Sequence, residues 1–145
     1  MKLALTIGDV AGIGPEVLLK ALREPLADDV TLFVYGDYAA LRRENERLGE
    51  AGLAAETFER RFAAVDGCET TLEGDRVGVI DVAPDLEIAD VDKGEGDARC
   101  ARLQQRSFVR AVDDVVDERA QAVVTAPWNK SLFETIGEPI VGHTD

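Results

Sequence analysis

The strongest constraint on the fold is an almost unbroken run of β-branched and aromatic residues, Val-Thr-Leu-Phe-Val-Tyr at positions 30–35, closed by Gly36 and Asp37. Such residues favour strands, and a strand without alternating polar positions is typically buried on both faces. Strands buried on both faces belong mainly to parallel sheets that helices cover. The run therefore predicts a buried strand with parallel neighbours.

The remaining segments alternate between strand and helix patterns. Further β-prone runs lie at residues 2–7, 77–82 and 122–125, and helical patterns lie at residues 15–22, 38–48, 98–119 and 130–136. The expected inward faces are Val17, Leu18, Ala21 and Leu22 in the first helix and Leu103, Phe108, Ala111, Val112 and Val115 in the long one. Residues 56–76 predict an extended excursion or a hairpin. The alternation predicts an α/β fold, a mostly parallel sheet flanked by helices, without an internal domain boundary.

The charge balance argues against two classes of partner. The chain has 29 acidic and 16 basic residues, a net charge of −13, and its lysines and arginines are scattered. Nucleic acids and anionic membrane surfaces both require clustered cations. No run approaches the roughly 18 apolar residues that span a bilayer, and the first apolar run ends too early for a signal peptide. We therefore expect a cytoplasmic protein that binds neither nucleic acid nor a membrane.

Two cysteines, Cys68 and Cys100, are present, without CxxC spacing. Since the chain also lacks a secretory signal, a disulfide framework or a thiolate metal site has little support. Both thiols are predicted to be reduced and buried.

A glycine-rich loop follows the first strand and opens the first helix. Three glycines fall within residues 8–14, Pro15 suits the first helical position, and Glu16 suits the positive end of the helix dipole. Such a loop can receive an anion, but Val17 stands where a dinucleotide-binding motif has its third glycine, and a P-loop Gly-Lys-Ser/Thr is missing. From the residues alone, a structural tight turn and a ligand loop are equally supported. For Asp9, a turn or capping role is at least as well supported as a ligand contact.

A second group of polar residues follows the last predicted strand. Thr125, Asn129 and Lys130 are delivered to the carboxyl end of that strand, where ligands bind in open α/β sheets. A single lysine such as Lys130 is more commonly a solvated surface charge. The only histidine, His143, is by itself as compatible with a surface or core position as with a site, and one histidine cannot build a metal site.

Three blocks carry a family resemblance. Residues 6–16, Thr-Ile-Gly-Asp-Val-Ala-Gly-Ile-Gly-Pro-Glu, resemble the opening signature of the β-decarboxylating dehydrogenases, with their isocitrate/isopropylmalate dehydrogenase-like fold. They are most similar to the 4-hydroxythreonine-4-phosphate dehydrogenase (PdxA) family of vitamin B6 synthesis. Thr-Ala-Pro-Trp-Asn-Lys at 125–130 and Gly-His-Thr-Asp at 142–145 resemble two later motifs of that family, in the same order. Val10 replaces a usual proline, and this change loses no polar group.

The resemblance implies an NAD-dependent dehydrogenase that also needs a divalent metal cation. In that chemistry, the alcohol of 4-phosphooxy-L-threonine gives a hydride to NAD⁺ and the β-keto acid loses CO₂. The metal lowers the pKa of the alcohol. Three residue roles are implied: His143 and Thr144 bind the substrate, Thr125, Asn129 and Lys130 line the cleft, and Gly12, Ile13, Gly14 and Glu16 border the cofactor pocket. The family's metal ligands lie downstream, so neither a metal ligand nor a catalytic residue is assigned within this chain.

Residues 1–145 are therefore expected to be the N-terminal portion of a longer two-domain dehydrogenase. By resemblance the complete enzyme is a homodimer, and the isolated chain is expected to be inactive. Two alternatives stay open. One is a sibling enzyme acting on another phosphorylated four-carbon acid, such as erythronate or threonate 4-phosphate. The other is a noncatalytic remnant that binds a ligand or a partner chain.

Overall fold

The computed structural model describes residues 1–140 and contains a five-stranded sheet in the order β3-β4-β2-β1-β5. The strands are β1 (Lys2–Thr6), β2 (Thr31–Gly36), β3 (Phe62–Val65), β4 (Val77–Asp81) and β5 (Ala122–Thr125). All four strand pairings are parallel. The predicted α/β fold with a parallel sheet is confirmed.

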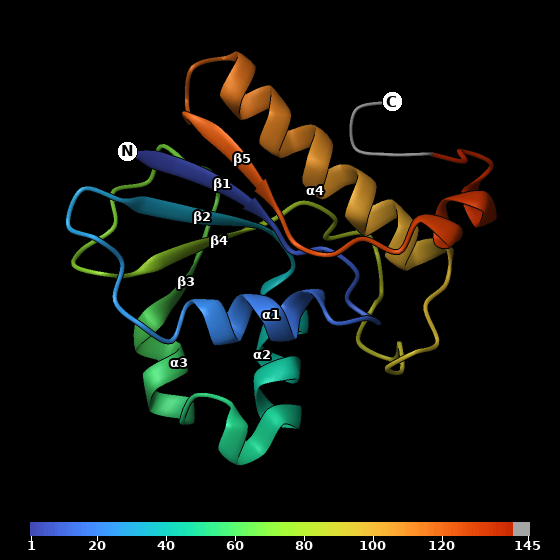
Figure 1. Cartoon of the computed structure of the whole chain (residues 1–145), viewed down its shortest axis with the longest axis horizontal. Coiled ribbons are helices and arrows are strands. Elements are labelled where there is room, and N and C mark those ends of the chain that lie inside the picture. The colour runs from blue at the N-terminus through green and yellow to red at the C-terminus, as the bar shows by residue number, and fades with distance from the viewer. Residues whose placement is uncertain (141–145) are drawn as a thin grey trace.

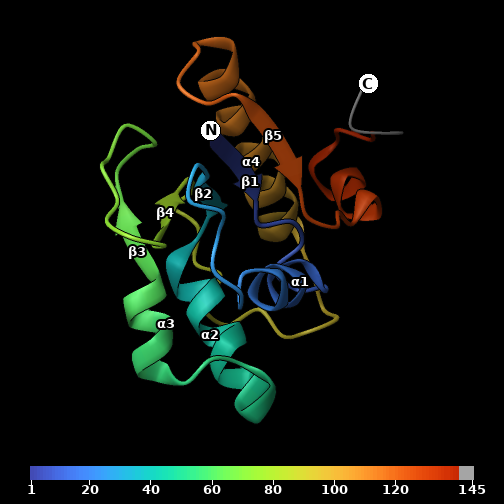
Figure 2. The same cartoon turned by 60° about the vertical axis from the view of Figure 1, so that its left-hand side comes forward.

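Helices cover both faces of the sheet (Figure 1; Figure 2). On one face lie α1 (Gly14–Ala21), α2 (Tyr38–Leu48) and α3 (Ala55–Arg61), and on the other lies α4 (Ala98–Val116). Two short 3₁₀ helices, η1 (Gly49–Ala51) and η2 (Lys130–Ile136), complete the set of elements. The short helix predicted at 130–136 is confirmed as η2.

Strand β2 forms the centre of the sheet, as its composition predicts. Leu32 and Val34 pack in the apolar core beneath α1 to α3, whereas Phe33 and Tyr35 pack in the core beneath α4. None of these four side chains is more than 7% exposed. A strand whose residues are apolar on both faces is thus buried between two helical layers.

The prediction for residues 56–76 is wrong. These residues contain part of α3 and all of β3, which pairs in parallel with β4 instead of forming a hairpin. Phe58 and Phe62 are each 1% exposed, and their ring centroids lie 4.8 Å apart. Between them Arg61 is also buried, because its guanidinium donates to the carbonyl oxygens of Glu24 and Asp75. A charged residue at an inward position obscured the helical pattern.

The two predicted helix faces need smaller corrections. In α1, Val17 is 42% exposed and Ala21 is exposed, so the buried face consists of Leu18, Leu19 and Leu22. The long helix ends at Val116 rather than at residue 119, because Glu118 adopts a left-handed backbone conformation with φ of 58°. Within α4, Leu103 and Ala111 are buried, whereas Phe108, Val112 and Val115 are partly buried.

Cys68 and Cys100 are both free and buried, as predicted. Burial raises the pKa of each thiol above its usual value, which keeps both protonated at neutral pH. Among residues 1–140, the helices are all too short or too polar to cross a bilayer.

Candidate functional site

The glycine loop between β1 and α1 is shaped by close backbone contacts. Gly8 has a φ of +73°, and a Cβ atom there would lie 2.5 Å from the carbonyl oxygen of Pro127. At Gly14, a Cβ atom would lie 2.5 Å from the carbonyl oxygen of Ile7. Only glycine fits either position without displacing the backbone. The tight turn considered from the sequence is therefore present.

The side chain of Asp9 stabilises the turn of the glycine loop. It is 5% exposed, and its Oδ1 accepts the backbone N–H of Ala11 at 3.0 Å. Its own N–H donates to the carbonyl oxygen of Pro127 at 3.0 Å. This bond joins the glycine loop to the segment that follows β5, so the two motifs singled out in the sequence meet at the carboxyl ends of adjacent strands.

The segment after β5 is held by a buried glutamine on α4. Gln104 is fully buried; its Oε1 accepts the N–H of Asn129 at 2.9 Å, and its Nε2 donates to the carbonyl oxygen of Cys100 at 3.2 Å. Trp128 adds an aromatic anchor, stacked on Phe133 with 5.2 Å between ring centroids. Sequence reasoning missed Gln104, although it lies four residues after Cys100 on the inward face of the long helix.

Replacing Gln104 with leucine should lower the free energy of unfolding by about 2 kcal/mol, because the part-buried N–H of Asn129 loses its acceptor and the buried side chain loses its own hydrogen bond. Urea unfolding measures the loss. Gln105→Leu is the control: that side chain makes its hydrogen bond to Glu138 at the surface, and its replacement should change stability by less than about 0.5 kcal/mol. Equal losses in the two variants would show that Gln104 has no special part in holding Asn129.

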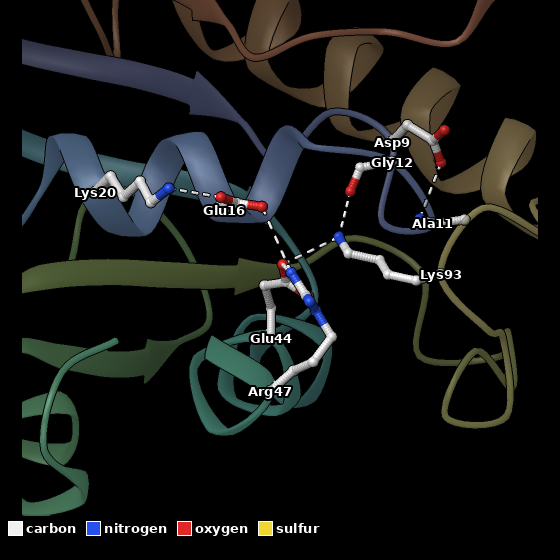
Figure 3. A network of polar contacts seen from close by, with 8 residues as sticks. All are labelled: Asp9, Ala11, Gly12, Glu16, Lys20, Glu44, Arg47 and Lys93. Carbon is white, nitrogen blue, oxygen red and sulfur yellow. Dashed lines mark hydrogen bonds and ion pairs between the residues drawn. The ribbon is translucent and has the colours of Figure 1, made fainter. Parts of the chain in front are cut away.

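A segment of residues 93–96, which we call the strap, contacts the glycine loop. The Gly94 N–H donates to the carbonyl oxygen of Ala11 at 2.7 Å, and the Lys93 ammonium donates to the carbonyl oxygen of Gly12. Lys93 also pairs with Glu44 of α2 at 3.1 Å (Figure 3). The strap therefore connects Ala11 and Gly12 of the loop to α2 through Lys93 and Glu44.

Glu44 is the centre of an ion-pair network that extends to α1. Arg47 lies 2.7 Å from Glu44 and 3.4 Å from Glu16, and Glu16 pairs in turn with Lys20 at 2.6 Å (Figure 3). Burial favours the neutral form of Glu44, but hydrogen bonds from Arg47 and Lys93 outweigh it and hold its pKa below the usual value. For Glu16, the hydrogen bond from Lys20 lowers the pKa. Both carboxyls are therefore ionised at neutral pH.

The structure assigns internal contacts to most of the residues predicted to border the cofactor. Gly12 and Gly14 pack against Asp9 and Ile7, and the Glu16 carboxylate is engaged by two cations. Ile13 is different, because 59% of its surface is exposed at the apex of the loop. The exposed Ile13 is therefore the one member of this set that offers an apolar surface to a ligand.

The predicted cleft residues lie on the same edge of the sheet as the loop. Thr125 ends β5 directly beside Thr6 of β1, and it is exposed. Asn129 is half-buried and accepts a hydrogen bond from Ser131 at 2.7 Å, and Lys130 is exposed. His143 and Thr144, predicted to bind substrate, lie outside the described residues.

Within residues 1–140, the His, Cys, Asp and Glu side chains form no group of three or more that is able to hold a metal ion. The described part of the chain therefore does not fit a divalent metal.

Comparison with known proteins identifies the family of this chain. The model of the family described as pyridoxal phosphate biosynthetic protein PdxA matches residues 28–145. A D-threonate 4-phosphate dehydrogenase of Salmonella typhimurium is 32% identical over 98% of the chain and 41% of its own length. A 4-hydroxythreonine-4-phosphate dehydrogenase of Bradyrhizobium diazoefficiens is 33% identical over 99% of the chain and 41% of its own length.

Solved structures agree with the sequence relatives. The crystal structure of 4-hydroxythreonine-4-phosphate dehydrogenase from Klebsiella pneumoniae matches with a TM-score of 0.79 and 30% identity, over 99% of this chain and 42% of the other. The enzyme of the same name from Burkholderia phymatum gives a TM-score of 0.81 and 26% identity, over 99% and 41%. The chain thus spans about 41% of the length of the Salmonella and Bradyrhizobium relatives. It belongs to the PdxA family of pyridoxal phosphate biosynthetic proteins.

Proposed function

We propose that the chain is the N-terminal part of an NAD-dependent dehydrogenase that oxidises, with decarboxylation, 4-phosphooxy-L-threonine in pyridoxal phosphate synthesis. The observation that carries this proposal is the junction between the glycine loop and the segment after β5, where the Asp9 N–H donates to Pro127 at 3.0 Å. It brings two family motifs together at the carboxyl ends of β1 and β5, the edge at which open α/β sheets bind ligands.

The proposal gives each candidate residue a binding or positioning role. Thr125 and Asn129 supply hydrogen-bonding groups to the cleft, and Lys130 supplies a positive charge for an anionic substrate. NAD supplies the hydride acceptor when bound, and the protein supplies its orientation. In this arrangement the exposed Ile13 would offer its apolar side chain to the cofactor, and Gly12, Gly14 and Glu16 would border the cofactor pocket. His143 and Thr144 bind the phosphate end of the substrate.

The resemblance to the family implies that the metal ligands lie downstream, and within residues 1–140 the His, Cys, Asp and Glu side chains form no group of three or more that could hold a metal ion. The residues of this chain bind and orient the substrate and the cofactor. We extend the proposal to a homodimeric, cytoplasmic complete enzyme.

The 145-residue chain alone should not form NADH when it is mixed with NAD, a divalent cation and 4-phosphooxy-L-threonine, because its described part does not fit a metal. Absorbance of NADH measures the reaction. Turnover that disappears in a His143→Ala variant would contradict this expectation. The same assay on a chain extended to the length of its relatives should show turnover, and failure there would contradict the proposed activity.

A second candidate substrate is supported by the relatives themselves. The Salmonella relative at 32% identity is named for D-threonate 4-phosphate, whereas the Bradyrhizobium relative at 33% is named for 4-hydroxythreonine 4-phosphate. The two acids differ at carbon 2, where a hydroxyl replaces an amino group. Values of kcat/KM for both acids, and for erythronate 4-phosphate, on the extended chain separate these activities.

A noncatalytic role, binding a ligand or a partner chain, is the remaining alternative. The lack of a metal-holding group in residues 1–140 favours it for this chain in isolation. An extended chain that binds the phosphorylated acids and forms no NADH would support this role.

A further inference from the structure

The apex of the glycine loop has few restraints of its own. Gly12 has no side chain, and that of Ile13 is 59% exposed, so core packing does not fix this part of the loop. Its internal restraints are the Gly12 N–H, which donates to the carbonyl oxygen of Asp9 at 3.1 Å, and the Ile13 carbonyl oxygen, which accepts the N–H of Val17 at 3.0 Å. A loop that lacks side-chain packing at its apex samples other conformations more readily unless a neighbouring segment also restrains it.

The strap supplies that outside restraint. Lys93 donates to the carbonyl oxygen of Gly12, and Gly94 donates to the carbonyl oxygen of Ala11 at 2.7 Å. Figure 3 shows the Lys93 ammonium between the loop and Glu44 of α2. A hydrogen bond from a charged donor is stronger than one between neutral groups. The single ammonium therefore carries much of the restraint on Gly12.

Glu44 holds Lys93 in this position. The carboxylate is 5% exposed, lies 3.1 Å from Lys93 and 2.7 Å from Arg47, and is carried by a rigid helix of eleven residues. For stability alone, an apolar side chain is often equal or better at such a site, because burying charges costs desolvation energy. A buried carboxylate between two cations is more readily explained by its effect on Lys93, whose ammonium it orients toward the carbonyl oxygen of Gly12.

We propose that Lys93, anchored by Glu44, is a positioning residue that holds the apex of the glycine loop in the conformation that receives the dinucleotide. The inference rests on the proposed function, which places this loop at the border of the cofactor pocket. Arg47, which also pairs with Glu44, lies 3.4 Å from Glu16 on α1. Glu44 is thus linked through Lys93 to the loop and through Arg47 to α1.

The first test measures amide hydrogen exchange in the loop without any ligand. In Lys93→Met the side chain keeps its length and loses its charge, and amide hydrogen exchange at Gly12 and Gly94 should accelerate about 10- to 100-fold, the equivalent of one lost charged hydrogen bond. Exchange at the core residue Val79 should stay within about threefold. Lys93→Arg should restore most of the protection. Unchanged exchange at Gly12, or an equal increase at Val79, overturns the proposal.

Two further variants test the anchor and the specificity of the effect. Glu44→Gln keeps the shape of the anchor and removes its charge, so it should accelerate exchange at Gly12 as Lys93→Met does. Lys20→Met removes a cation from the exposed end of the same network, where the lysine side chain is 52% exposed. It should alter exchange at Gly12 by less than about twofold. An effect of Lys20→Met as large as that of Lys93→Met would overturn the assignment to Lys93.

The second test adds NAD to the native chain and the variants and follows the loop amides by NMR. The dissociation constant should rise in Lys93→Met and stay unchanged in Lys20→Met. Equal binding by the native chain and Lys93→Met overturns the positioning role. If the native chain gives no shifts with NAD, the proposed cofactor role of this loop fails, whereas the exchange rates still decide whether Lys93 holds the loop.

Discussion

Replacing Gly8 with alanine should lower the free energy of unfolding by about 3 kcal/mol. A left-handed backbone conformation costs a residue with a Cβ atom about 1 kcal/mol or slightly more, and Gly8 has a φ of +73°. The new Cβ would also lie 2.5 Å from the carbonyl oxygen of Pro127, and an overpacked contact of this kind costs about 1–3 kcal/mol. Urea unfolding at neutral pH measures the sum.

Gly137 offers a matched control because it has the same φ of +73° and no atom within 4 Å of a Cβ placed on it. Gly137→Ala should therefore cost only the conformational part, about 1 kcal/mol. The difference between the two variants reports the contact between the glycine loop and Pro127. Equal losses in Gly8→Ala and Gly137→Ala would contradict the close junction of the two motifs.

The second large effect is expected at Asp114, a fully buried carboxylate on the inner face of α4. It accepts the hydroxyl of Tyr35 at 2.5 Å and the Cys68 thiol at 3.4 Å, and it pairs with Arg119 at 2.6 Å. Burial favours the neutral acid, but the hydrogen bonds from Tyr35, Arg119 and Cys68 outweigh it. The pKa of Asp114 consequently lies below its usual value.

Asp114→Asn should lower the free energy of unfolding by about 3 kcal/mol at pH 7. The substitution removes the negative charge that compensates Arg119 at a buried site. A carboxyl whose pKa is lower in the folded state stabilises the fold above its unfolded pKa of about 3.9, and this stabilisation is lost as the pH falls further. The difference between the native chain and Asp114→Asn should therefore be full at neutral pH and shrink below about pH 4. Denaturant unfolding at several pH values measures it.

The adjacent Asp113 is the control for this prediction because it is exposed on the same helix. Asp113→Asn should change stability by less than about 0.5 kcal/mol at any of these pH values. A difference between native chain and Asp114→Asn that did not shrink in acid would contradict a stabilising charge at Asp114.

Much of the fold was predictable from the sequence because the apolar runs are short, dense and separated by clear turn residues. The run at 30–35 predicts a strand buried on both faces, and β2 occupies the centre of the sheet. The tight turn of the glycine loop was predictable for another reason. Close backbone contacts such as that between Gly14 and Ile7 require glycine, so the glycines themselves mark the turn. The loop's roles toward a ligand stay predictions.

What escaped prediction involves charged or polar residues at inward positions. Arg61, a buried charged residue, ends α3 and interrupts its apolar pattern. Glu44 shares a helix face with Leu41, Asn45 and Leu48, but its charge predicts a solvent-exposed position. Lys93 lies in an acidic segment, and Gly12, the loop residue that it contacts, is 81 residues away in the sequence. Periodicity reports which face of a helix is apolar, and it carries no information about such long-range ion pairs.

The glycine loop and the segment after β5, joined by the hydrogen bond from the Asp9 N–H to Pro127, are proposed to form one site that takes the cofactor and the substrate. This claim is tested most directly by titrating the nitrogen-15-labelled chain with 4-phosphooxy-L-threonine and following its amide resonances. We expect the resonances of residues 8–14 and 125–130 to shift together along one binding curve. Shifts confined to one of the two segments, or to neither, would contradict the claim.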